Sequence, residues 1–163
     1  MPEIISGEEL RHLATVPVLK VVGEGCLALR HDAPASAAVR EMTENDLGAV
    51  AVEDDVGRVV GIFTERDVLL RGLSEGEEWL ASPLSKLMTP DPVTVTASDS
   101  VAEAIHRMKE GHFRHLPVID EQGRAVAMLS IRRVIADLAE HFPAEVQNLP
   151  PDPKRESRNL YGG

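Results

Sequence analysis

The sequence predicts an α+β fold in which two copies of one unit pack about a pseudo-two-fold axis. The first observation is a repeat, because residues 17–82 and 83–148 are two copies of one 66-residue segment. Identical residues coincide when the copies are aligned without a gap, among them Pro17 and Pro83, Met42 and Met108, and Arg66 and Arg132. The second is that each copy alternates β-branched runs with helical apolar spacing. Two copies are too few for an open solenoid, so we expect them to close around a cleft suited to a small ligand.

Composition narrows the classes of protein that fit. The chain has 163 residues, which suits one compact domain or two small ones, and each copy alone would bury only a modest core. The formal net charge of −10 argues against a nucleic-acid partner, since a phosphate backbone is bound by a basic face. No stretch approaches the roughly 20 apolar residues of a membrane span, and no secretory signal is visible. We therefore expect a cytoplasmic protein with no membrane partner.

Each copy is expected to form a strand, a helix, a hairpin of two strands and a second helix. Residues 1–16 precede the copies as a lead-in, in which a short helix is expected over residues 8–14 with Ser6 as its candidate N-cap. The expected elements are residues 26–30, 35–42, 48–52, 59–63 and 65–73 in the first copy, and residues 92–96, 101–108, 116–119, 125–129 and 131–141 in the second.

Helical spacing supports the first helix of each copy. Apolar residues recur at i, i+3, i+4 and i+7 from Ala35 and again from Val101. Asp32, with Pro34 just inside, marks the start of the helix in the first copy. A capping box that begins at Ser100 marks it in the second.

Turns and linkers complete the outline. Acidic turns that end in Gly57 and Gly123 between β-branched runs indicate the two hairpins. Residues 74–82 link the copies and contain Trp79, which we expect to anchor the linker on the core, although an exposed contact with a partner is the alternative. Residues 149–163 are rich in proline and charge, so we expect an extended or disordered tail.

The most specific local pattern lies in residues 61–67, where a buried strand passes into a helix. Thr64 is at the junction, where free backbone N–H groups can receive an anion and its hydroxyl can donate to a phosphate oxygen. Asp67 lies one turn into the helix and can accept two hydrogen bonds from a cis-diol. The pair suits a nucleotide, with ribose on Asp67 and phosphate near Thr64. A capping box formed by the same two residues accounts for the spacing equally well.

The second copy favours the ligand interpretation, because it keeps the hydroxyl at Ser130 but replaces the diol acceptor by Arg133. This asymmetry predicts one ribose site, with positive charge from the second copy facing the shared cleft. Arg114 and His115 precede a buried strand, so their heads could reach the edge of the cleft. A solvated arginine and a hydrogen-bonded histidine are the structural alternative there. With Arg132 these residues form a cationic cluster that suits a small anion.

Three segments resemble the motifs of the CBS domain, and the pair of copies resembles a Bateman module. The segments are residues 61–67, 87–95 and 114–120, which occur in order and fit the repeat distance. The resemblance covers residues 17–141. The first copy departs from the pattern at its start, where residues 22–25 replace the sequence found at residues 88–91.

The resemblance implies an intertwined α+β fold with two clefts that bind adenine nucleotides (AMP, ADP or ATP) or S-adenosylmethionine. It implies that Asp67 binds ribose, that Thr64 and Ser130 bind phosphate or nearby backbone, and that Arg114 binds phosphate. The base would lie against residues 27–29 or 93–95. The residues expected at the nucleotide site are Ile62, Phe63, Thr64, Arg66, Asp67, Arg114, His115, Pro117, Ser130, Arg132 and Arg133. Because Arg133 breaks the pattern, the second cleft would supply charge or stay empty.

We therefore expect a non-catalytic regulatory module that requires no cofactor. It would bind an adenosyl ligand and signal by a conformational change to an effector protein in trans, and the resemblance also implies a homodimer. An enzyme is disfavoured because the sequence shows no Ser-His-Asp set, no nucleophile elbow and no Walker-type loop.

Two alternatives stay open. The first is a ligand-free module that acts through dimerisation. The second is a zinc-binding member of the same family that uses Cys and His. No metal site is expected, because the candidate ligands lack the spacing of known zinc motifs: Cys26, His12, His31, His106, His112 and His115. A buried, unreactive thiol is the expected state of Cys26, which as the only cysteine excludes an intramolecular disulfide.

Overall fold

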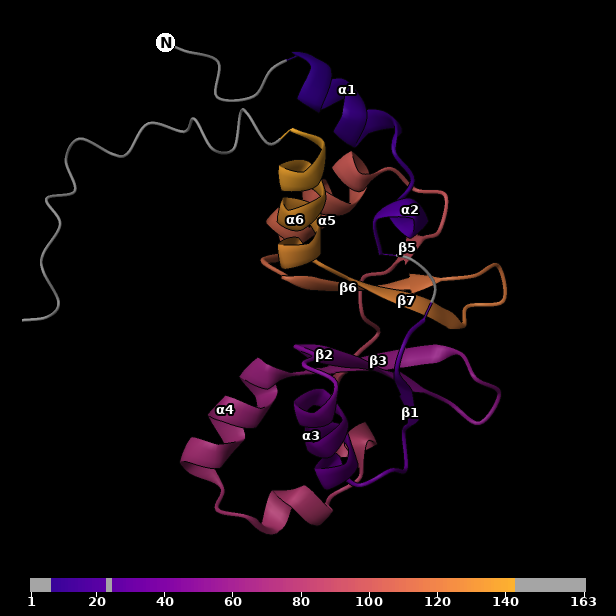
Figure 1. The fold of residues 1–163 in the computed structure, drawn as a ribbon. Coiled ribbons are helices and arrows are strands. Elements are labelled where there is room, and N and C mark those ends of the chain that lie inside the picture. Colours follow the sequence, from indigo (N-terminus) through magenta and orange to yellow (C-terminus); the bar gives the residue numbers. More distant parts are fainter. Residues whose placement is uncertain (1–6, 23–24, 143–163) are drawn as a thin grey trace, which may run out of the picture.

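The computed structural model describes residues 7–22 and 25–142, and it confirms the α+β class and the repeated order of elements (Figure 1). The helices are α1 (Gly7–Thr15), α2 (Val18–Val22), α3 (Ala35–Glu44), α4 (Glu65–Ser74), α5 (Val101–Gly111) and α6 (Ile131–His141), with two 3-10 turns, η1 (Glu78–Ala81) and η2 (Leu84–Lys86). The strands are β1 (Ala28–Arg30), β2 (Ala49–Glu53), β3 (Val59–Thr64), β4 (Thr89–Pro90), β5 (Val95–Thr96), β6 (His115–Ile119) and β7 (Ala125–Ser130).

The two hairpins are built in the same way, as the repeat predicts. In each, an antiparallel pair has an irregularity at the equivalent place, between Val52 and Glu53 in one and between Val118 and Ile119 in the other. Each pair is extended by a parallel strand, so that the sheets have the orders β1-β2-β3-β4 and β5-β6-β7. The turn glycines have a left-handed backbone, with φ of 81° and 80°, a conformation that glycine adopts without steric cost.

The first strand of each copy is shorter than predicted. β1 covers three residues and β5 covers two. The chain before β5 forms β4 instead, which pairs with β3 of the other sheet. Helix α3 begins at Ala35 as predicted, but the expected capping signal at Asp32, with Pro34 inside the helix, was wrong. Pro34 is the N-cap and no side chain caps this helix, because the Asp32 carboxylate accepts hydrogen bonds from Arg30 at 3.0 Å instead.

The cap of α5 is formed in one direction. The Ser100 hydroxyl accepts a hydrogen bond from the backbone N–H of Glu103 at 3.2 Å, as the capping box requires. The Glu103 carboxylate accepts from the Nε of Arg107 at 2.8 Å and thereby stabilises the exposed face of the same helix. The expected Ser6 cap, the last residues of the second copy and the tail at 149–163 lie outside the described residues.

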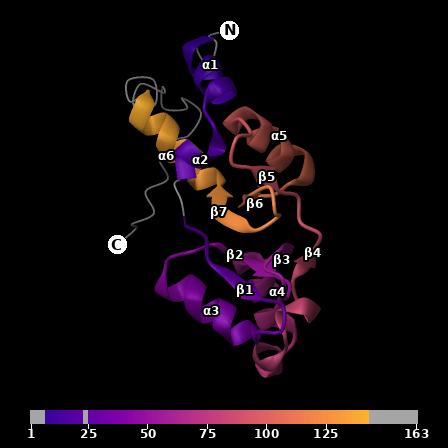
Figure 2. The same cartoon turned by 90° about the vertical axis from the view of Figure 1, so that its right-hand side faces the viewer.

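The two sheets face one another at the middle of the molecule (Figures 1 and 2). Helices α5 and α6 cover the outer side of one sheet, and α3 and α4 lie on the outer side of the other. Backbone hydrogen bonds join the layers, from the N–H of Val59 to the carbonyl of Gly123 at 2.9 Å and from Gly25 to Val126 at 3.1 Å. This arrangement places both strand–helix junctions near the region where the two halves meet.

Each half completes its core with a segment that precedes the other half. Val18 and Val21 of α2 are fully buried with the side chains of α5, β6, β7 and α6, which belong to the second copy. Leu84 and Leu87 are buried with α3, β2 and β3 of the first. Isolated bridges between Pro17 and Ser100 and between the equivalent residues 34 and 83 mark the two crossings. The halves therefore share their cores by exchange.

The linker is anchored by its tryptophan, as predicted. The Trp79 side chain is only 6% exposed, and its ring centroid lies 6.5 Å from that of Phe63 at the centre of the core of the first half. In the part of the chain that the structure describes, no helix combines the length and the apolar character that a membrane crossing demands.

Replacing Trp79 with Ala should lower the free energy of unfolding by about 3–5 kcal/mol, because it removes a large buried ring and leaves a cavity. Urea denaturation followed by circular dichroism measures the change. Val56→Ala is the matched control, since the Val56 side chain is 66% exposed in the turn between β2 and β3 and its loss should change stability by no more than about 0.5 kcal/mol. Equal effects of the two substitutions would show that Trp79 is not an anchor.

Candidate functional site

The two strand–helix junctions have the same backbone geometry. At the end of β3, the N–H of Glu65 donates to the carbonyl of Gly48 at 3.0 Å, and at the end of β7 the N–H of Ile131 donates to the carbonyl of Arg114 at the same distance. Each helix therefore begins against the start of the neighbouring strand. The differences between the junctions come from their side chains alone.

The first junction contains the capping box that the spacing allowed. The Oδ2 atom of Asp67 accepts hydrogen bonds from the Thr64 N–H at 2.9 Å and from the Thr64 hydroxyl at 2.8 Å. In return the Asp67 N–H donates to the Thr64 hydroxyl oxygen at 3.4 Å. Both residues are partly exposed. The Asp67 carboxylate is thus held at the junction through Oδ2 alone.

At the second junction, Arg133 was predicted to face the cleft with its charge, but its side chain has a different partner. Ser130 caps α6 by accepting from the Arg133 N–H at 3.2 Å. The Arg133 side chain turns toward the first-copy segment, where its Nε donates to the carbonyl oxygen of Val21 at 2.7 Å. Val21 lies in the last turn of α2, whose carbonyls have no partner within the helix. Arg133 therefore ties the two halves together.

His115 reaches across to the first junction. Its ring lies over Gly48, so closely that a Cβ atom added at Gly48 would be 2.7 Å from Nε2 and 3.5 Å from a carboxylate oxygen of Glu65. Burial lowers the pKa of His115, Glu65 opposes that shift, and Arg114 and Arg132 lower the pKa further. The imidazole is therefore uncharged at neutral pH.

The sequence pattern pointed to His115 but not to its neighbours Gly48 and Glu65. The available signal was the replacement of the bulky Arg114 by Gly48 at the equivalent position of the first copy, which makes room for a ring from the other half. Close approach of another group is a common reason for glycine beside a strand.

The remaining predicted residues fall into two groups. Ile62, Phe63 and Pro117 are buried, and the Phe63 ring packs in the core against Trp79. The exposed group consists of Arg66, Arg114 and Arg132. The first group can border a ligand only through backbone or edge atoms, whereas the second can move toward an anion.

An open groove with a volume of about 440 Å³ lies beside the junction, between α3 and α4. It includes Glu65 but neither Thr64 nor Asp67. The residues that line it are Val39, Met42, Thr43, Asp46, Leu47, Glu65, Val68 and Leu69. Its apolar lining makes it distinct in character from the polar junction.

Cys26 has the expected state. The thiol is partly buried, and burial, together with the nearby charge of Glu53, raises its pKa to about 11. It is therefore protonated at neutral pH and a weak nucleophile.

Gly48→Ala should destabilise the protein by about 1–3 kcal/mol, because the new methyl group would meet the His115 ring. Combining it with His115→Ala should remove most of that cost, which a double-mutant cycle in urea would measure as a coupling free energy. A cycle with no coupling would show that the ring does not lie over Gly48.

The family model described as the CBS domain matches this chain twice, over residues 13–73 and 84–140. Two curated relatives are the meiotically up-regulated gene 70 protein of Schizosaccharomyces pombe, 38% identical over 112 residues, and an uncharacterized 17.7 kDa protein of Acidianus ambivalens, 40% identical over 95 residues. These alignments cover 69% and 58% of this chain but only 15% and 56% of the relatives' lengths.

Solved structures have the same fold. CBSX2 in complex with AMP aligns with a TM-score of 0.66 and 22% identity over 77% of this chain and 97% of its own. The CBS domain pair of MJ0100, in complex with 5-methylthioadenosine and S-adenosyl-L-methionine, aligns with a TM-score of 0.70 and 15% identity over 78% of this chain and 98% of its own. Hypoxic Response Protein I, with two coordinated zinc ions, aligns with a TM-score of 0.65 and 26% identity over 74% of this chain and 98% of its own. The chain belongs to the CBS domain family and contains two CBS repeats.

Proposed function

We propose that this chain is a non-catalytic regulatory module that binds an adenosyl ligand at the first strand–helix junction. The observation on which the proposal depends is the arrangement of Asp67, whose two hydrogen bonds from Thr64 both use Oδ2. Within residues 7–22 and 25–142 no donor occupies Oδ1, which leaves it to accept from a ribose hydroxyl. The AMP bound by CBSX2 and the 5-methylthioadenosine and S-adenosyl-L-methionine bound by MJ0100 support a ligand with an adenosyl group. The candidates in this class are AMP, ADP, ATP and S-adenosylmethionine.

The phosphate of a nucleotide would lie toward the second repeat. Arg114 and Arg132 are exposed there, and both are close enough to His115 to lower its pKa. The dipole at the N-terminus of α4 also favours an anion, whereas the N–H groups of Glu65 and Asp67 already have partners there. Arg133 takes the place of Asp67 at the second junction, so no carboxylate stands there to bind ribose, and its side chain is held by Val21. We therefore propose a single ribose site per chain.

The proposed signal is a change in how the two halves are placed relative to one another, passed to an effector protein in trans. A ligand that contacts Asp67 and Arg114 would touch both halves at once. Because the cores exchange α2 and η2, such a shift would also move the segments that cross between the halves. The excess of acidic residues on the chain supports a protein partner over a nucleic acid.

The exposed face of α4 supports the second candidate, a module that acts through homodimerisation. Leu69, Leu70 and Leu73 are all exposed on this helix, and Ile135 is exposed on α6 at the position equivalent to Leu69. Helix α4 contains no buried residue at all. Apolar side chains gathered on one helix are typical of a contact surface, and a second copy of the chain would cover the equivalent faces of both halves.

Asp67→Ala should weaken adenosyl-ligand binding by about 1–3 kcal/mol, the cost of leaving a ribose hydroxyl without its hydrogen-bond acceptor in the complex. Thermal shift with AMP, ADP, ATP and S-adenosylmethionine first identifies the ligand, since a ligand at about 100 times its Kd stabilises by roughly 2.7 kcal/mol. Calorimetric titration of that ligand then measures the loss of affinity.

Ser100→Ala is the matched control for this experiment. It removes the N-cap of α5, whereas Asp67→Ala removes the N3 partner in the capping box of α4, and it should cost a similar amount of stability, about 1 kcal/mol. It should leave ligand affinity unchanged, because Ser100 lies away from the junction. If Asp67→Ala lowers stability as Ser100→Ala does and ligand affinity stays the same, Asp67 is only a cap.

Leu73→Glu should convert a homodimer to a monomer, because it introduces a charge at the centre of the proposed contact. Sedimentation velocity measures the oligomeric state. Val56→Glu is the matched control, since Val56 is similarly exposed, at 66%, but lies in the hairpin turn. A monomeric wild-type protein, or equal effects of the two variants, would exclude dimerisation through α4.

A further inference from the structure

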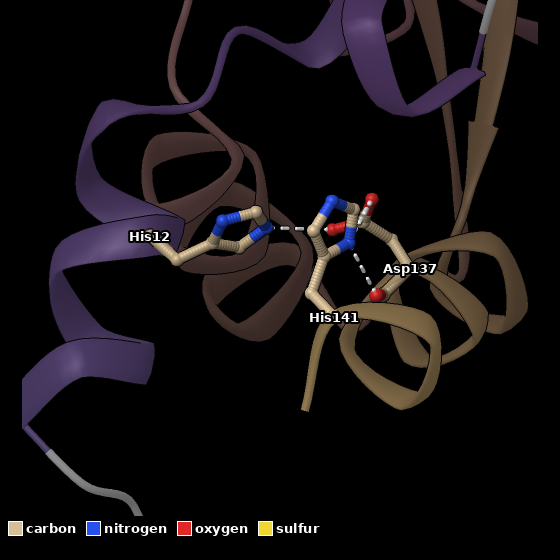
Figure 3. A group of neighbouring side chains, drawn as sticks. All are labelled: His12, Asp137 and His141. Atoms are coloured by element: carbon tan, nitrogen blue, oxygen red, sulfur yellow. Dashed lines mark hydrogen bonds and ion pairs between the residues drawn. The ribbon is translucent and has the colours of Figure 1, made fainter. Parts of the chain in front are cut away.

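Three side chains that could ligate a metal ion meet where the first and last described helices come together (Figure 3). His12 lies on α1, whereas Asp137 and His141 lie one turn apart on the same face of α6. When one ligand atom is taken from each residue, the three atoms all lie within 4.8 Å of one another. The set joins positions 125 residues apart in the sequence, so no spacing motif announces it.

The distances within the cluster are close to those of a metal site. The Nε2 atom of His12 is 2.9 Å from Oδ2 of Asp137, and the Nδ1 atom of His141 is 3.3 Å from Oδ1. Zinc binds imidazole nitrogen and carboxylate oxygen at about 2.0–2.2 Å, which places the ligand atoms of a tetrahedral site roughly 3.4 Å apart. The side chains would therefore need only small movements to surround an ion.

The cluster also contains a buried carboxylate. Asp137 is the one buried charged residue in the part of the chain that the structure describes, with a side chain only 10% exposed. A buried carboxylate is stable only when it is paired or coordinates a metal. The His12 ring closes the site by packing against the His141 ring, with centroids 4.6 Å apart, and against the edge of Phe142 at 5.4 Å.

We propose that His12, Asp137 and His141 bind a divalent first-row transition metal, with Zn²⁺ as the representative ion. Two imidazoles and one carboxylate suit this class, whereas Ca²⁺ and Mg²⁺ prefer ligand sets made only of oxygen. The Nδ1 atom of His141 now lies 2.9 Å from the carbonyl oxygen of Asp137. Binding takes that nitrogen as a ligand and leaves the imidazole proton on Nε2. Three protein ligands leave a fourth position for water or an external group.

The site is independent of the proposed nucleotide site. Asp137 and His141 lie in the last two turns of α6, whereas the junction residue Ser130 caps the first. It also needs no cysteine. A bound ion would fasten α1, which precedes the first repeat, to the final helix of the second repeat, and so would link the lead-in segment to the half whose core it covers.

Metal-free protein is titrated with Zn²⁺ by calorimetry and with Co²⁺ by visible absorption, which reports its coordination geometry. One equivalent should bind to the wild-type protein. His141→Ala should weaken binding at least tenfold, and because its side chain is 52% exposed, the metal-free variant should melt close to the wild type. His12→Ala should weaken binding similarly and confirm that both helices contribute.

His106→Ala is the matched control, because His106 also faces a carboxylate four residues away, Glu110 at 3.5 Å, but belongs to no cluster of three candidate ligands among the described residues. It should bind Zn²⁺ as the wild type does, and so should Cys26→Ser and Asp67→Ala. The proposal is overturned if the wild type binds no Zn²⁺, if His141→Ala and His12→Ala bind it unchanged, or if Cys26→Ser abolishes binding. Those results would make the cluster a hydrogen-bonded clamp between the helices.

Discussion

The exchange of core segments is the constraint on which the rest of the structure depends. Val18 and Val21 fill the core of the second half, and Leu84 and Leu87 fill that of the first. These aliphatic side chains are almost completely removed from water, and burying each contributes roughly 1.5–3 kcal/mol. Neither half can close its core without the segment that precedes the other. This requirement, rather than the few hydrogen bonds between the sheets, fixes how the two strand–helix junctions face one another.

A symmetric backbone thus supports asymmetric chemistry. Both junctions begin a helix with a hydroxyl cap, but the residue three positions later is a carboxylate at Asp67 and a cation at Arg133. The cation is used to hold α2, so its effect is on the assembly of the halves. His115 fits over Gly48 because the first copy has no side chain there. These two differences between the copies therefore have local electrostatic and steric consequences where the halves meet.

The sequence predicted the helices and hairpins well, because apolar periodicity and turn glycines are local properties. It could not predict where the crossing segments pack. The apolar residues of α2 indicate burial but not against which half, and the chain before β5 turned out to pair with β3 through β4. The capping box of Thr64 with Asp67 could not be told from a ligand site by spacing, since both need the same two residues three positions apart, and only the structure shows that the cap uses Oδ2 of Asp67. His12 and Asp137 are neighbours only through the tertiary fold.

The exchanged segments also bear on how such a chain can arise. A single 66-residue copy would present a core with one side open and a leading segment with nowhere of its own to pack. Two such chains would satisfy one another by reciprocal swapping, each lending its first turn of helix to its neighbour. Fusing the genes of that pair end to end would change no contact in the interior. Once both copies lie on one polypeptide, a position in one copy can differ from its counterpart in the other, as Gly48 and Arg133 do, without either half losing its core.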